Sequence, residues 1–478
     1  MDLGVTRAAG RGGEHRALVE RSFAASVGLT VVAAILPGSG FWFAGRRRLG
    51  AAIIVVTLAG LATALLFGLF TPRLYLHSVL QPARLTALII ALVVVAVAWV
   101  VIIVLSHLAL RPSEATGPQR VIGVCVAMTM CFVVATPFAV GASYAYTTRD
   151  FINQVFSKDP LSNTAPKNVS ADNPWAGEPR VNILLLGGDG SVNRQGVRTD
   201  SMIVASIDTA TGDTVLFSLP RNLENAPFPP GSPLAEVYPD GFQGPGDEGN
   251  WMLNAIYPLV PEEHPGLLGA TDNEGADALK MSISQILGLK VNYYVLINLQ
   301  GFVQLVNALG GITVNIDQAA PIGGNHDLNI PPTGYIQPGP NRHLDGHDAL
   351  WFARGRWTTD DYDRMERQRC VIDAVIKQAN PENVLLRYNQ IAAAGKKIAR
   401  TDIPQSLLPA LVDLGLKVKD AKVRSVVFRP NDHFNPASPD FAYIRSIVSK
   451  ALHPATPGVH KPKIVQPSES ACAYNPAG

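Results

Sequence analysis

Charged side chains are scarce in this sequence of 478 residues. Asp, Glu, Lys and Arg make up 16% of it, whereas apolar residues make up 47%. A chain with so few charges is too apolar to be water-soluble along its whole length. The two signs nearly cancel, to a formal charge of +2, which predicts no general affinity for nucleic acid or other polyanions.

Cysteine is also rare, with four residues in the chain. None belongs to a Cys-x-x-Cys pair, so nothing indicates that type of zinc site. Cys125 and Cys131 lie in an apolar segment and are expected to be small buried residues. Cys370 and Cys472 lie in the more polar part of the chain, where they form either a disulfide or two free thiols, because the sequence does not give the distance between their backbones.

The apolar residues are concentrated before Arg149. Three uncharged stretches there, residues 49–70, 85–106 and 121–146, are each long enough to cross a bilayer core of roughly 30 Å as a helix. We therefore expect residues 1–148 to form a membrane region, which would make this a multi-pass protein of the cell membrane.

A fourth uncharged stretch, residues 22–45, is interrupted by Pro and Gly at positions 37–40, before a bilayer-length helix is complete. If it crosses the membrane, the three arginines at 46–48 lie outside. If it is a re-entrant or interfacial hairpin, they join the basic N-terminus inside. The positive-inside rule favours the hairpin. It predicts three crossings instead of four, and an extracytoplasmic location for everything after residue 149.

The composition changes beyond the membrane region. Residues 149–180 are rich in Ser, Asn, Pro and Asp and predict a linker; residues 181–455 predict one globular domain with a C-terminal extension, and residues 456–478 a Pro-rich tail. Within the domain, short apolar runs alternate with segments of helical periodicity. This alternation predicts an α/β fold, a three-layer α/β/α-like domain. The expected strands are 181–187, 201–208, 214–219, 293–298 and 312–316, with 201–208 and 214–219 forming a hairpin. The expected helices are 276–287, 301–309, 346–353 and 361–379.

Two aspartates lie at predicted strand ends. Asp189 directly follows the first strand and Asp200 directly precedes the second, so neighbouring strands would bring both carboxylates to one edge of the sheet. Carboxylates together with substrate phosphates are the usual ligands of magnesium. The alternative is that Asp-Gly at a strand end is simply a turn signal.

Arginines form the second candidate group, at predicted element ends or on one short helix. Three residues of the helix, Arg364, Arg367 and Gln368, have i, i+3, i+4 spacing and are expected on one face. A guanidinium group binds phosphate oxygens through two parallel hydrogen bonds and keeps its positive charge, which suits a pyrophosphate site. The alternative is a solvated helix face paired with neighbouring carboxylates. The candidate arginines are Arg198, Arg221, Arg354, Arg356, Arg364 and Arg367, and the neighbouring carboxylates are Asp360, Asp361, Asp363 and Glu366.

Several sequence blocks, taken in order and spacing, resemble the LytR-CpsA-Psr family of cell-envelope phosphotransferases. The resemblance extends over about residues 181–377. The blocks are LLLGGDGSVNRQGVRTD (184–200), SLPR (218–221), LNAIY (253–257), ALGGI (308–312), LDGHDAL (344–350), RGR (354–356) and DYDRMERQ (361–368). The resemblance implies an α/β/α-like catalytic domain outside the membrane.

The resemblance also implies an activity. The chain would transfer a phosphorylated glycopolymer from a polyprenyl-pyrophosphate carrier to a muramic acid hydroxyl of peptidoglycan. Its partners would be the lipid-linked glycan, peptidoglycan and the membrane, with no nucleic acid. The bias toward Ala, Val, Pro and Arg resembles that of high-GC actinobacterial sequences, so arabinogalactan or another secondary wall polymer is the expected donor.

Residue roles follow from the same resemblance. Asp189 and Asp200 match two aspartates that bind Mg²⁺, with Mn²⁺ as a substitute, and Arg198 and Arg221 are the expected catalytic arginines. Asn222 stands where the family commonly has Asp, and because an amide cannot accept a proton, the general base stays unidentified. The expected pyrophosphate-binding residues are Arg198, Arg221, Arg354, Arg356, Arg364, Arg367 and Gln368, of which Arg367 is the least certain.

Two other functions remain open. A pyrophosphatase would use the same site with water as the acceptor. A transcriptional attenuator is the third alternative, but a domain outside the membrane cannot contact DNA, and no helix-turn-helix pattern is evident. A polyprenyl tail also requires an apolar tunnel. Its candidate lining residues, for which ordinary core packing is the favoured interpretation, are Phe217, Leu253, Ile256, Phe302, Val306 and Trp351.

Overall fold

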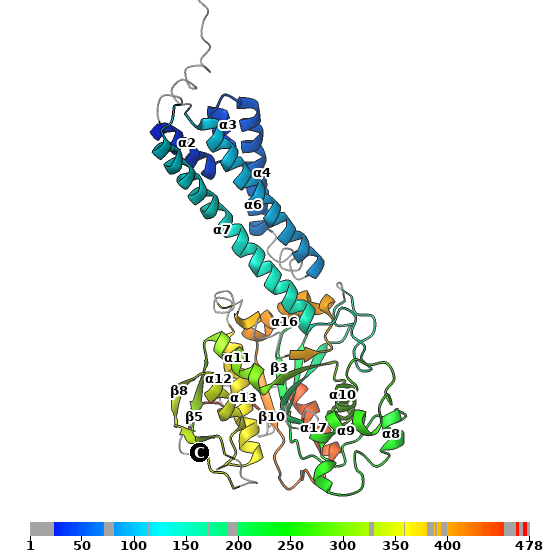
Figure 1. Cartoon of the computed structure of the whole chain (residues 1–478). Coiled ribbons are helices and arrows are strands. Elements are labelled where there is room, and N and C mark those ends of the chain that lie inside the picture. The colour runs from blue at the N-terminus through cyan, green and yellow to red at the C-terminus, as the bar shows by residue number, and fades with distance from the viewer. Residues whose placement is uncertain are drawn as a thin grey trace, which may run out of the picture. The chain divides into compact units, whose positions relative to one another are not determined.

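The structure, a computed structural model, describes residues 23–70, 81–112, 114–170, 173–189, 198–324, 329–357, 359–379, 387, 390–392, 399–453, 465–467 and 472–475. Its contacts divide the chain into two compact units, Met1–Asp150 and Phe151–Gly478 (Figure 1). Each unit has its own core and is described by itself.

The first unit contains three helices that are long and apolar enough to cross a membrane, α4 (Arg47–Phe70), α6 (Pro82–Leu110) and α7 (Gly117–Val155). They contain the three predicted segments. Helix α7 continues past the predicted end of its span at residue 146 without a break. Cys125 lies on the exposed surface of α7 and Cys131 is half-buried, so the expectation that both are buried is wrong. A small apolar side chain is as stable in contact with lipid as it is in a protein core.

The fourth uncharged stretch forms two short helices, α2 (Phe23–Ile35) and α3 (Ser39–Phe43). Gly38 in the turn between them has a φ of 98°, and a Cβ atom there would lie 2.6 Å from the carbonyl oxygen of Gly50, so the turn requires glycine. Helix α2 has 13 residues, too few to cross a bilayer core.

Side-chain hydrogen bonds fix α2 along the last turns of α6. Ser26 Oγ donates to the Leu110 carbonyl at 2.9 Å, and Trp99 Nε1 donates to the Ala34 carbonyl at 3.0 Å. The segment before α4 is therefore a broken hairpin packed beside the end of α6. Whether this hairpin is re-entrant or interfacial in the membrane stays a prediction.

The second unit is built on a seven-stranded mixed sheet with the strand order β11-β10-β3-β2-β1-β4-β9. The pairs β1–β4 and β3–β10 are parallel, and the other four pairs are antiparallel. The expected hairpin of β2 and β3 is present. The strands are β1 (Arg180–Asp189), β2 (Arg198–Asp208), β3 (Thr214–Leu219), β4 (Tyr293–Asn298), β9 (Ala399–Thr401), β10 (Val423–Val427) and β11 (Val465–Pro467).

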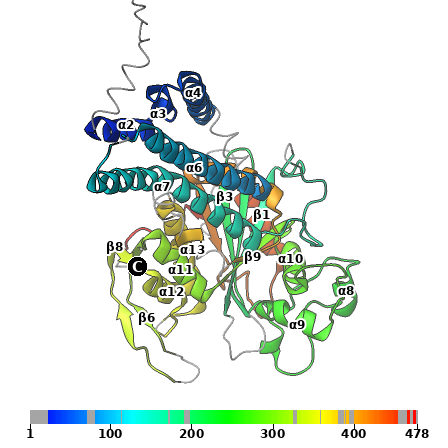
Figure 2. The same ribbon diagram turned by 45° about the horizontal axis from the view of Figure 1, so that its top comes forward.

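Helices cover both faces of this sheet, as Figures 1 and 2 show. One face packs against α9 (Ile256–Glu263), α10 (Glu274–Leu287) and α17 (Phe441–Leu452) through the largest core cluster. The other face packs against α13 (Asp361–Gln378), whose Ile372 contacts Ile203 of β2 and Leu216 of β3. Helices α11 (Leu299–Leu309) and α12 (Gly346–Arg354) lie beside α13. The prediction of a three-layer α/β/α domain is confirmed.

A second core lies under α11, α12 and α13, and includes Val306, Ile312 and Phe352. Two small antiparallel sheets complete this part of the domain, one of β5 (Ile312–Ile316) with β8 (Gly339–Leu344) and one of β6 (Ala320–Ile322) with β7 (Gly334–Ile336). The remaining short elements are α8 (Pro233–Val237), η1 (Glu248–Asn250), η2 (Leu253–Ala255), η3 (Gln405–Leu407) and α16 (Leu408–Asp420).

The predicted linker is part of the second unit. Its Phe156, Val169 and Trp175 pack against Ile403 and Leu414, which belong to the segment around η3 and α16. Isolated apolar residues in a polar segment give no periodicity, so the sequence does not predict that this segment packs against the domain. The segment between these residues also makes hydrogen bonds to the domain. In one of them the Leu161 backbone amide donates to Asp272 Oδ2 at 3.0 Å.

The predicted tail also belongs to the domain. Strand β11 pairs with β10 at one edge of the sheet, and Cys472 forms a disulfide with Cys370 of α13, with a Cα–Cα distance of 5.6 Å. The Asn315 side-chain amide donates to the Cys472 carbonyl at 2.9 Å. Of the two alternatives for these cysteines, the disulfide is therefore the one found.

A buried charge network joins the linker to the domain. Lys280 of α10 is fully buried and its Nζ atom lies 2.9 Å from Asp277 Oδ1, contacts Asp402 Oδ2 and donates to Ser162 Oγ at 2.8 Å. Asp402 Oδ1 accepts a hydrogen bond from the Tyr294 amide of β4 at 2.8 Å. Every charge of this network has partners, which a buried charge requires.

Candidate functional site

A cavity of about 1170 Å³ lies between the sheet and the helices α11, α12 and α13. Its lining is of two kinds. The apolar lining comes from both the strands and the helices, and the polar lining contains most of the predicted arginines. The apolar residues include Leu185, Ile203, Ile297, Phe302, Leu305, Leu350, Trp351, Val371, Ile372 and Val375; the polar ones include Asp200, Ser201, Arg221, Arg354, Arg356, Thr359, Asp360, Asp361, Asp363, Arg364 and Gln368.

Asp361, at the first position of α13, is the common partner of three arginines. Its Oδ1 atom lies 2.9 Å from Arg356 Nη1, and its Oδ2 atom lies 2.9 Å from Arg364 Nη2 and 3.5 Å from Arg221 Nε. From the sequence, Asp361 is expected only as a carboxylate partner on a solvated helix face. The i, i+3 spacing of Asp361 and Arg364 is the signal that identifies the pair. We call Arg221, Arg356, Arg364 and Asp361 the arginine cluster.

Asp200 joins the arginine cluster from a β-bulge. Gly187 of β1 pairs with Ser201 of β2, but Gly188 pairs with Thr199, which leaves Asp200 without a partner in the ladder. Bulges re-aim side chains next to binding sites. Here the Asp200 carboxylate receives Arg221 Nη1 at 3.0 Å, and the Asp200 carbonyl accepts from Arg364 Nη2 at 3.1 Å.

Asp189 and Arg198 are opposite each other at the ends of β1 and β2. The backbone thus brings Asp189 and Asp200 to the same edge of the sheet, as the strand pattern predicts. The side chains of Asp189 and Arg198 lie outside the described residues, as do residues 190–197 entirely. Their predicted roles stay predictions.

Arg221 is held by the turn that follows β3. The Asn254 amide donates to the Arg221 carbonyl at 3.1 Å, and the Leu253 amide donates to the Leu223 carbonyl at 2.8 Å, so η2 fixes this turn. The LNAIY block therefore supports the SLPR block through the backbone. The Arg221 side chain is 28% exposed, which leaves it open to a ligand in the cavity.

Arg364 approaches the same point from α13 and is buried, with 3% exposure. Burial lowers the pKa of Arg364 to about 10, against the opposing effect of the Asp361 carboxylate. The guanidinium is therefore charged at neutral pH. Its Nε donor has no acceptor among the described residues, so Arg364 retains hydrogen-bonding capacity for an anion.

The arginine cluster carries an excess of positive charge. Three guanidinium groups share the carboxylates of Asp200 and Asp361, and Arg354 at the end of α12 also lines the cavity, over the Trp351 ring at 5.8 Å. Several fixed guanidinium groups beside an apolar wall suit an anionic group with many oxygens, such as a phosphate or pyrophosphate.

Gln368 lies on the cavity side of α13, as its spacing from Arg364 predicts. Its Oε1 atom accepts from Ser201 Oγ at 3.0 Å and its Nε2 donates to the Ala353 carbonyl at 3.2 Å. The amide therefore connects β2, α12 and α13 at the wall of the cavity.

Arg367 is directed elsewhere, although it shares the same helical spacing. It donates from Nε to the Phe352 carbonyl at 2.8 Å, from Nη1 to Thr359 Oγ1 at 3.2 Å, and from Nη2 to the Gly355 carbonyl. These bonds fix the connection between α12 and α13, which carries Arg356. The pyrophosphate contact expected of Arg367 stays a prediction.

Asn222 does not line the cavity. Its side chain lies near the Tyr362 hydroxyl, and its buried Oδ1 atom has no partner among the described residues. Asp363, a carboxylate that lines the cavity, has both oxygens engaged, because Oδ2 accepts from the Asp360 amide at 3.4 Å and Oδ1 accepts from Arg429. Neither residue is placed to accept a proton from a group in the cavity.

Two of the six candidate tunnel residues line the cavity, Phe302 and Trp351. The other four are wrong as lining residues: Phe217, Leu253 and Ile256 belong to the large core on the opposite face of the sheet, and Val306 belongs to the second core. Hydrophobicity alone predicts burial but not which buried residues face an open space.

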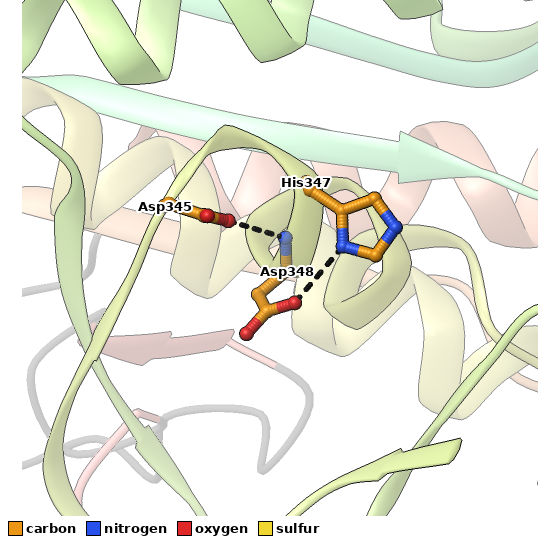
Figure 3. A group of neighbouring side chains, drawn as sticks. All are labelled: Asp345, His347 and Asp348. Carbon is orange, nitrogen blue, oxygen red and sulfur yellow. Dashed lines mark hydrogen bonds and ion pairs between the residues drawn. The ribbon is translucent and has the colours of Figure 1, made fainter. Parts of the chain in front are cut away.

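One cluster of potential metal ligands lies elsewhere among the described residues, at the start of α12 (Figure 3). Asp345 accepts from the Asp348 amide at 2.9 Å as the helix N-cap, and His347 Nδ1 lies 3.0 Å from Asp348 Oδ1. Helix capping accounts for the position of Asp345, and His347 is 60% exposed. These contacts give the cluster a structural explanation.

The fold and the cavity together define a class of protein. Its members have a three-layer α/β/α domain that follows three apolar helices, and a cavity in which an apolar wall adjoins an arginine cluster. The chain belongs to the LytR_cpsA_psr family, whose sequence profile matches residues 145–438. The resemblance found in the motifs is thereby confirmed. The match also includes the docked linker and extends beyond the block that ends near residue 377.

Individual relatives are distant. The chain is 29% identical over 303 residues to "Biofilm regulatory protein A" of Streptococcus mutans, covering 61% of this chain and 66% of the relative. It is 27% identical over 275 residues to polyisoprenyl-teichoic acid–peptidoglycan teichoic acid transferase TagU of Bacillus cereus, covering 55% of this chain and 75% of the relative. The second name agrees with the prediction that the chain is a transferase.

Among solved structures, a protein from Streptococcus agalactiae is similar to this chain with a TM-score of 0.43 and 26% identity, covering 60% of this chain and 91% of that protein. TagV of Bacillus subtilis gives a TM-score of 0.40 at 21% identity, covering 57% and 96%.

Proposed function

We propose that this chain transfers a phosphorylated glycopolymer from a polyprenyl-pyrophosphate carrier to a hydroxyl group of muramic acid in peptidoglycan. The observation that carries the proposal is the single cavity in which an arginine cluster adjoins an apolar wall. A polyprenyl pyrophosphate has the same two parts, an anionic group and a long apolar chain. The relative named as a polyisoprenyl-teichoic acid transferase supports a polyprenyl-linked substrate. The proposed glycan, arabinogalactan or another secondary wall polymer, follows from the composition of the chain.

In this proposal the pyrophosphate lies against Arg221, Arg356 and Arg364, and the polyprenyl chain lies along the apolar wall that includes Phe302 and Trp351. Three arginines that share two carboxylates have capacity left for phosphate oxygens, since each guanidinium carries five donors. Gln368 and Arg354 would orient the phosphate nearer the sugar.

A divalent cation, Mg²⁺ or Mn²⁺, is part of the proposal. The donor set fits a hard cation, because the half-buried Asp200 carboxylate lies at the sheet edge and the backbone of Asp189 lies on the neighbouring strand. Asp200 would hold the ion, together with Asp189 as the sequence predicts. When bound, such an ion neutralises charge on the phosphate oxygens.

The residues of the chain would act mainly by position and charge. The muramic acid oxygen forms a bond to the sugar-side phosphorus, the bond from that phosphorus to the bridging oxygen breaks, and polyprenyl phosphate leaves. Arg221 and Arg364 stabilise the negative charge that develops on the phosphoryl and leaving oxygens, and they do so without reorganisation because they are already fixed by Asp361.

This activity places the second unit outside the cell, on the side where peptidoglycan lies. The basic N-terminus and the basic residues at 46–48 and 111–120 support that orientation. The α2–α3 hairpin, which precedes residues 46–48, packs beside the end of α6 that precedes residue 111. The proposed localisation is therefore a multi-pass membrane protein with an extracytoplasmic catalytic domain.

Donor binding provides the first test. The full chain in detergent, examined by native mass spectrometry, should form a one-to-one complex with a polyprenyl-pyrophosphate oligosaccharide and bind polyprenol itself much more weakly. Arg364→Met should lose most of this binding, whereas Asp345→Asn, at the exposed cap of α12, should keep it. Equal binding of polyprenol and the pyrophosphate donor would contradict the proposed site.

A further inference from the structure

The transfer reaction releases a proton that the guanidinium groups of the arginine cluster cannot accept. The acceptor hydroxyl loses its hydrogen as its oxygen bonds to phosphorus, and guanidinium groups remain protonated throughout. The groups of this chain that can accept this proton at the polar part of the cavity are carboxylates. Four carboxylates line it among the residues whose side chains are described: Asp200, Asp360, Asp361 and Asp363.

Three of these carboxylates already have hydrogen-bond or ion-pair partners or a proposed role in cation binding. Both oxygens of Asp361 receive guanidinium groups, and a proton there would displace an arginine from the phosphate site. Asp200 receives Arg221 and is the proposed cation ligand. Asp363 gives one oxygen to Arg429 and the other to the Asp360 amide.

Asp360 differs from these three. Its Oδ1 atom accepts from the Asp363 amide at 2.8 Å as the N-cap of α13, which fixes the direction of the side chain. Its Oδ2 atom accepts no hydrogen bond from a described residue. Asp360 is exposed at the cavity wall, next in sequence to the common partner of the arginines, so an acceptor that arrives from solvent can reach its free oxygen.

We propose that Asp360 is the general base of this chain, an assignment that rests on the proposed function. The acceptor hydroxyl oxygen forms its bond to the sugar-side phosphorus while its proton passes to Asp360 Oδ2. The bond from phosphorus to the bridging oxygen breaks, polyprenyl phosphate leaves with that oxygen, and Asp360 returns the proton to water. The site thereby functions without a carboxylate at position 222, whose side chain does not line the cavity.

The cap geometry makes a clean test available. Asn caps a helix as well as Asp does, so Asp360→Asn keeps the hydrogen bond to the Asp363 amide and removes only the basic oxygen. In the full chain, with a lipid-pyrophosphate oligosaccharide and peptidoglycan fragments, we expect Asp360→Asn to lower kcat by about 100-fold or more, the usual contribution of a general base. Donor affinity and thermal unfolding should stay at wild-type values, and Asp360→Glu should restore part of kcat.

Asp345→Asn is the matched control, because Asp345 is the N-cap of α12, makes the same type of bond at 2.9 Å and does not line the cavity. It should leave kcat unchanged. Asp360→Ser, another good cap, should fail like Asp360→Asn, which separates loss of the base from any particular effect of Asn.

Two results would overturn the assignment: a kcat of Asp360→Asn within a fewfold of wild type, or a loss that appears equally in donor affinity, which would make Asp360 a binding residue. Failure of the wild-type chain to form any conjugate from a donor that it binds would instead refute the proposed function. The two failures are therefore distinguishable.

Discussion

The Nη1 atom of Arg221 lies 3.0 Å from the Oδ1 atom of Asp200. This ion pair joins the turn after β3 to the bulge in β2, and the same guanidinium also reaches Asp361 of α13 through Nε at 3.5 Å. Both partners of the pair are about one-third exposed, and such pairs contribute little to stability, about 1 kcal/mol or less. The pair is therefore better explained by ligand binding than by folding.

Removal of either partner of this pair should stop turnover without unfolding the protein. For Arg221→Ala we expect at least the ~100-fold loss of kcat that follows removal of one transition-state donor, and a similar loss for Asp200→Ala. The midpoint of thermal unfolding should change little in both. Turnover by steady-state kinetics is the measurement, with Asp345→Asn as the control. Near-normal turnover of Arg221→Ala would exclude the arginine cluster as the reaction centre.

Arg367 should behave as a positioning residue. Arg367→Met leaves the Phe352 and Gly355 carbonyls without their donor, and each buried group left unsatisfied costs about 1–3 kcal/mol. We expect lower thermal stability and a lower kcat, caused by displacement of Arg356. A direct pyrophosphate ligand would give a different result, namely weaker donor binding at unchanged stability, and calorimetry beside a donor titration separates the two.

The disulfide should stabilise the second unit. It closes a loop of 102 residues, and removal of a native disulfide typically costs about 2–5 kcal/mol. Cys370→Ser with Cys472→Ser should lower the unfolding midpoint, and reducing agent should lower that of the wild type but not of the double variant. Under denaturing conditions the wild type should show two free thiols before reduction and four afterwards. Four thiols before reduction would contradict the pairing.

The buried Lys280 network should be essential for folding. Lys280→Met leaves Asp277 and Asp402 buried without their ammonium partner, and breaking a buried ion pair costs about 3–5 kcal/mol. Chemical denaturation of the full chain in detergent measures this change. Lys419→Met, at an exposed position of α16, is the control and should change stability by less than about 0.5 kcal/mol. Equal effects of the two variants would show that the network contributes nothing.

The same network gives the stability a pH dependence. Burial opposes the charged form of Asp277, but the Lys280 ammonium and hydrogen bonds from Asn163 and Thr271 outweigh it and hold the pKa of Asp277 below its ordinary value. Because the folded-state pKa is the lower one, this stabilisation is complete above about pH 4, the unfolded value, and is lost as the pH falls further. Denaturation curves at pH 7 and pH 3 should therefore differ less in Lys280→Met than in wild type.

Local pattern was sufficient for much of the fold. The apolar runs of β1, β2, β3 and β4 and the periodicity of α10 and α13 predicted these elements, because their side chains alternate between one core and solvent or another layer. Segments that are ordered by tertiary contacts were not predictable. The linker depends on isolated residues such as Phe156 and Trp175, and β11 has three residues that pair with an existing strand.

In the candidate site, too, local spacing predicts some features and tertiary contacts decide the others. Helical spacing predicted that Arg364 and Gln368 share a face, and both line the cavity. Arg367 has the same spacing, but it donates to the Phe352 and Gly355 carbonyls near the end of α12. The common role of Asp361 and the free oxygen of Asp360 depend on which neighbours fold against α13, and one sequence does not contain that information.

Product analysis tests the central claim most directly. The full chain, supplied with a polyprenyl-pyrophosphate oligosaccharide, peptidoglycan fragments and Mg²⁺, should yield a phosphodiester-linked conjugate and one polyprenyl phosphate for each conjugate, as measured by mass spectrometry. Release of free phospho-oligosaccharide with no conjugate would contradict the account and make the chain a pyrophosphatase.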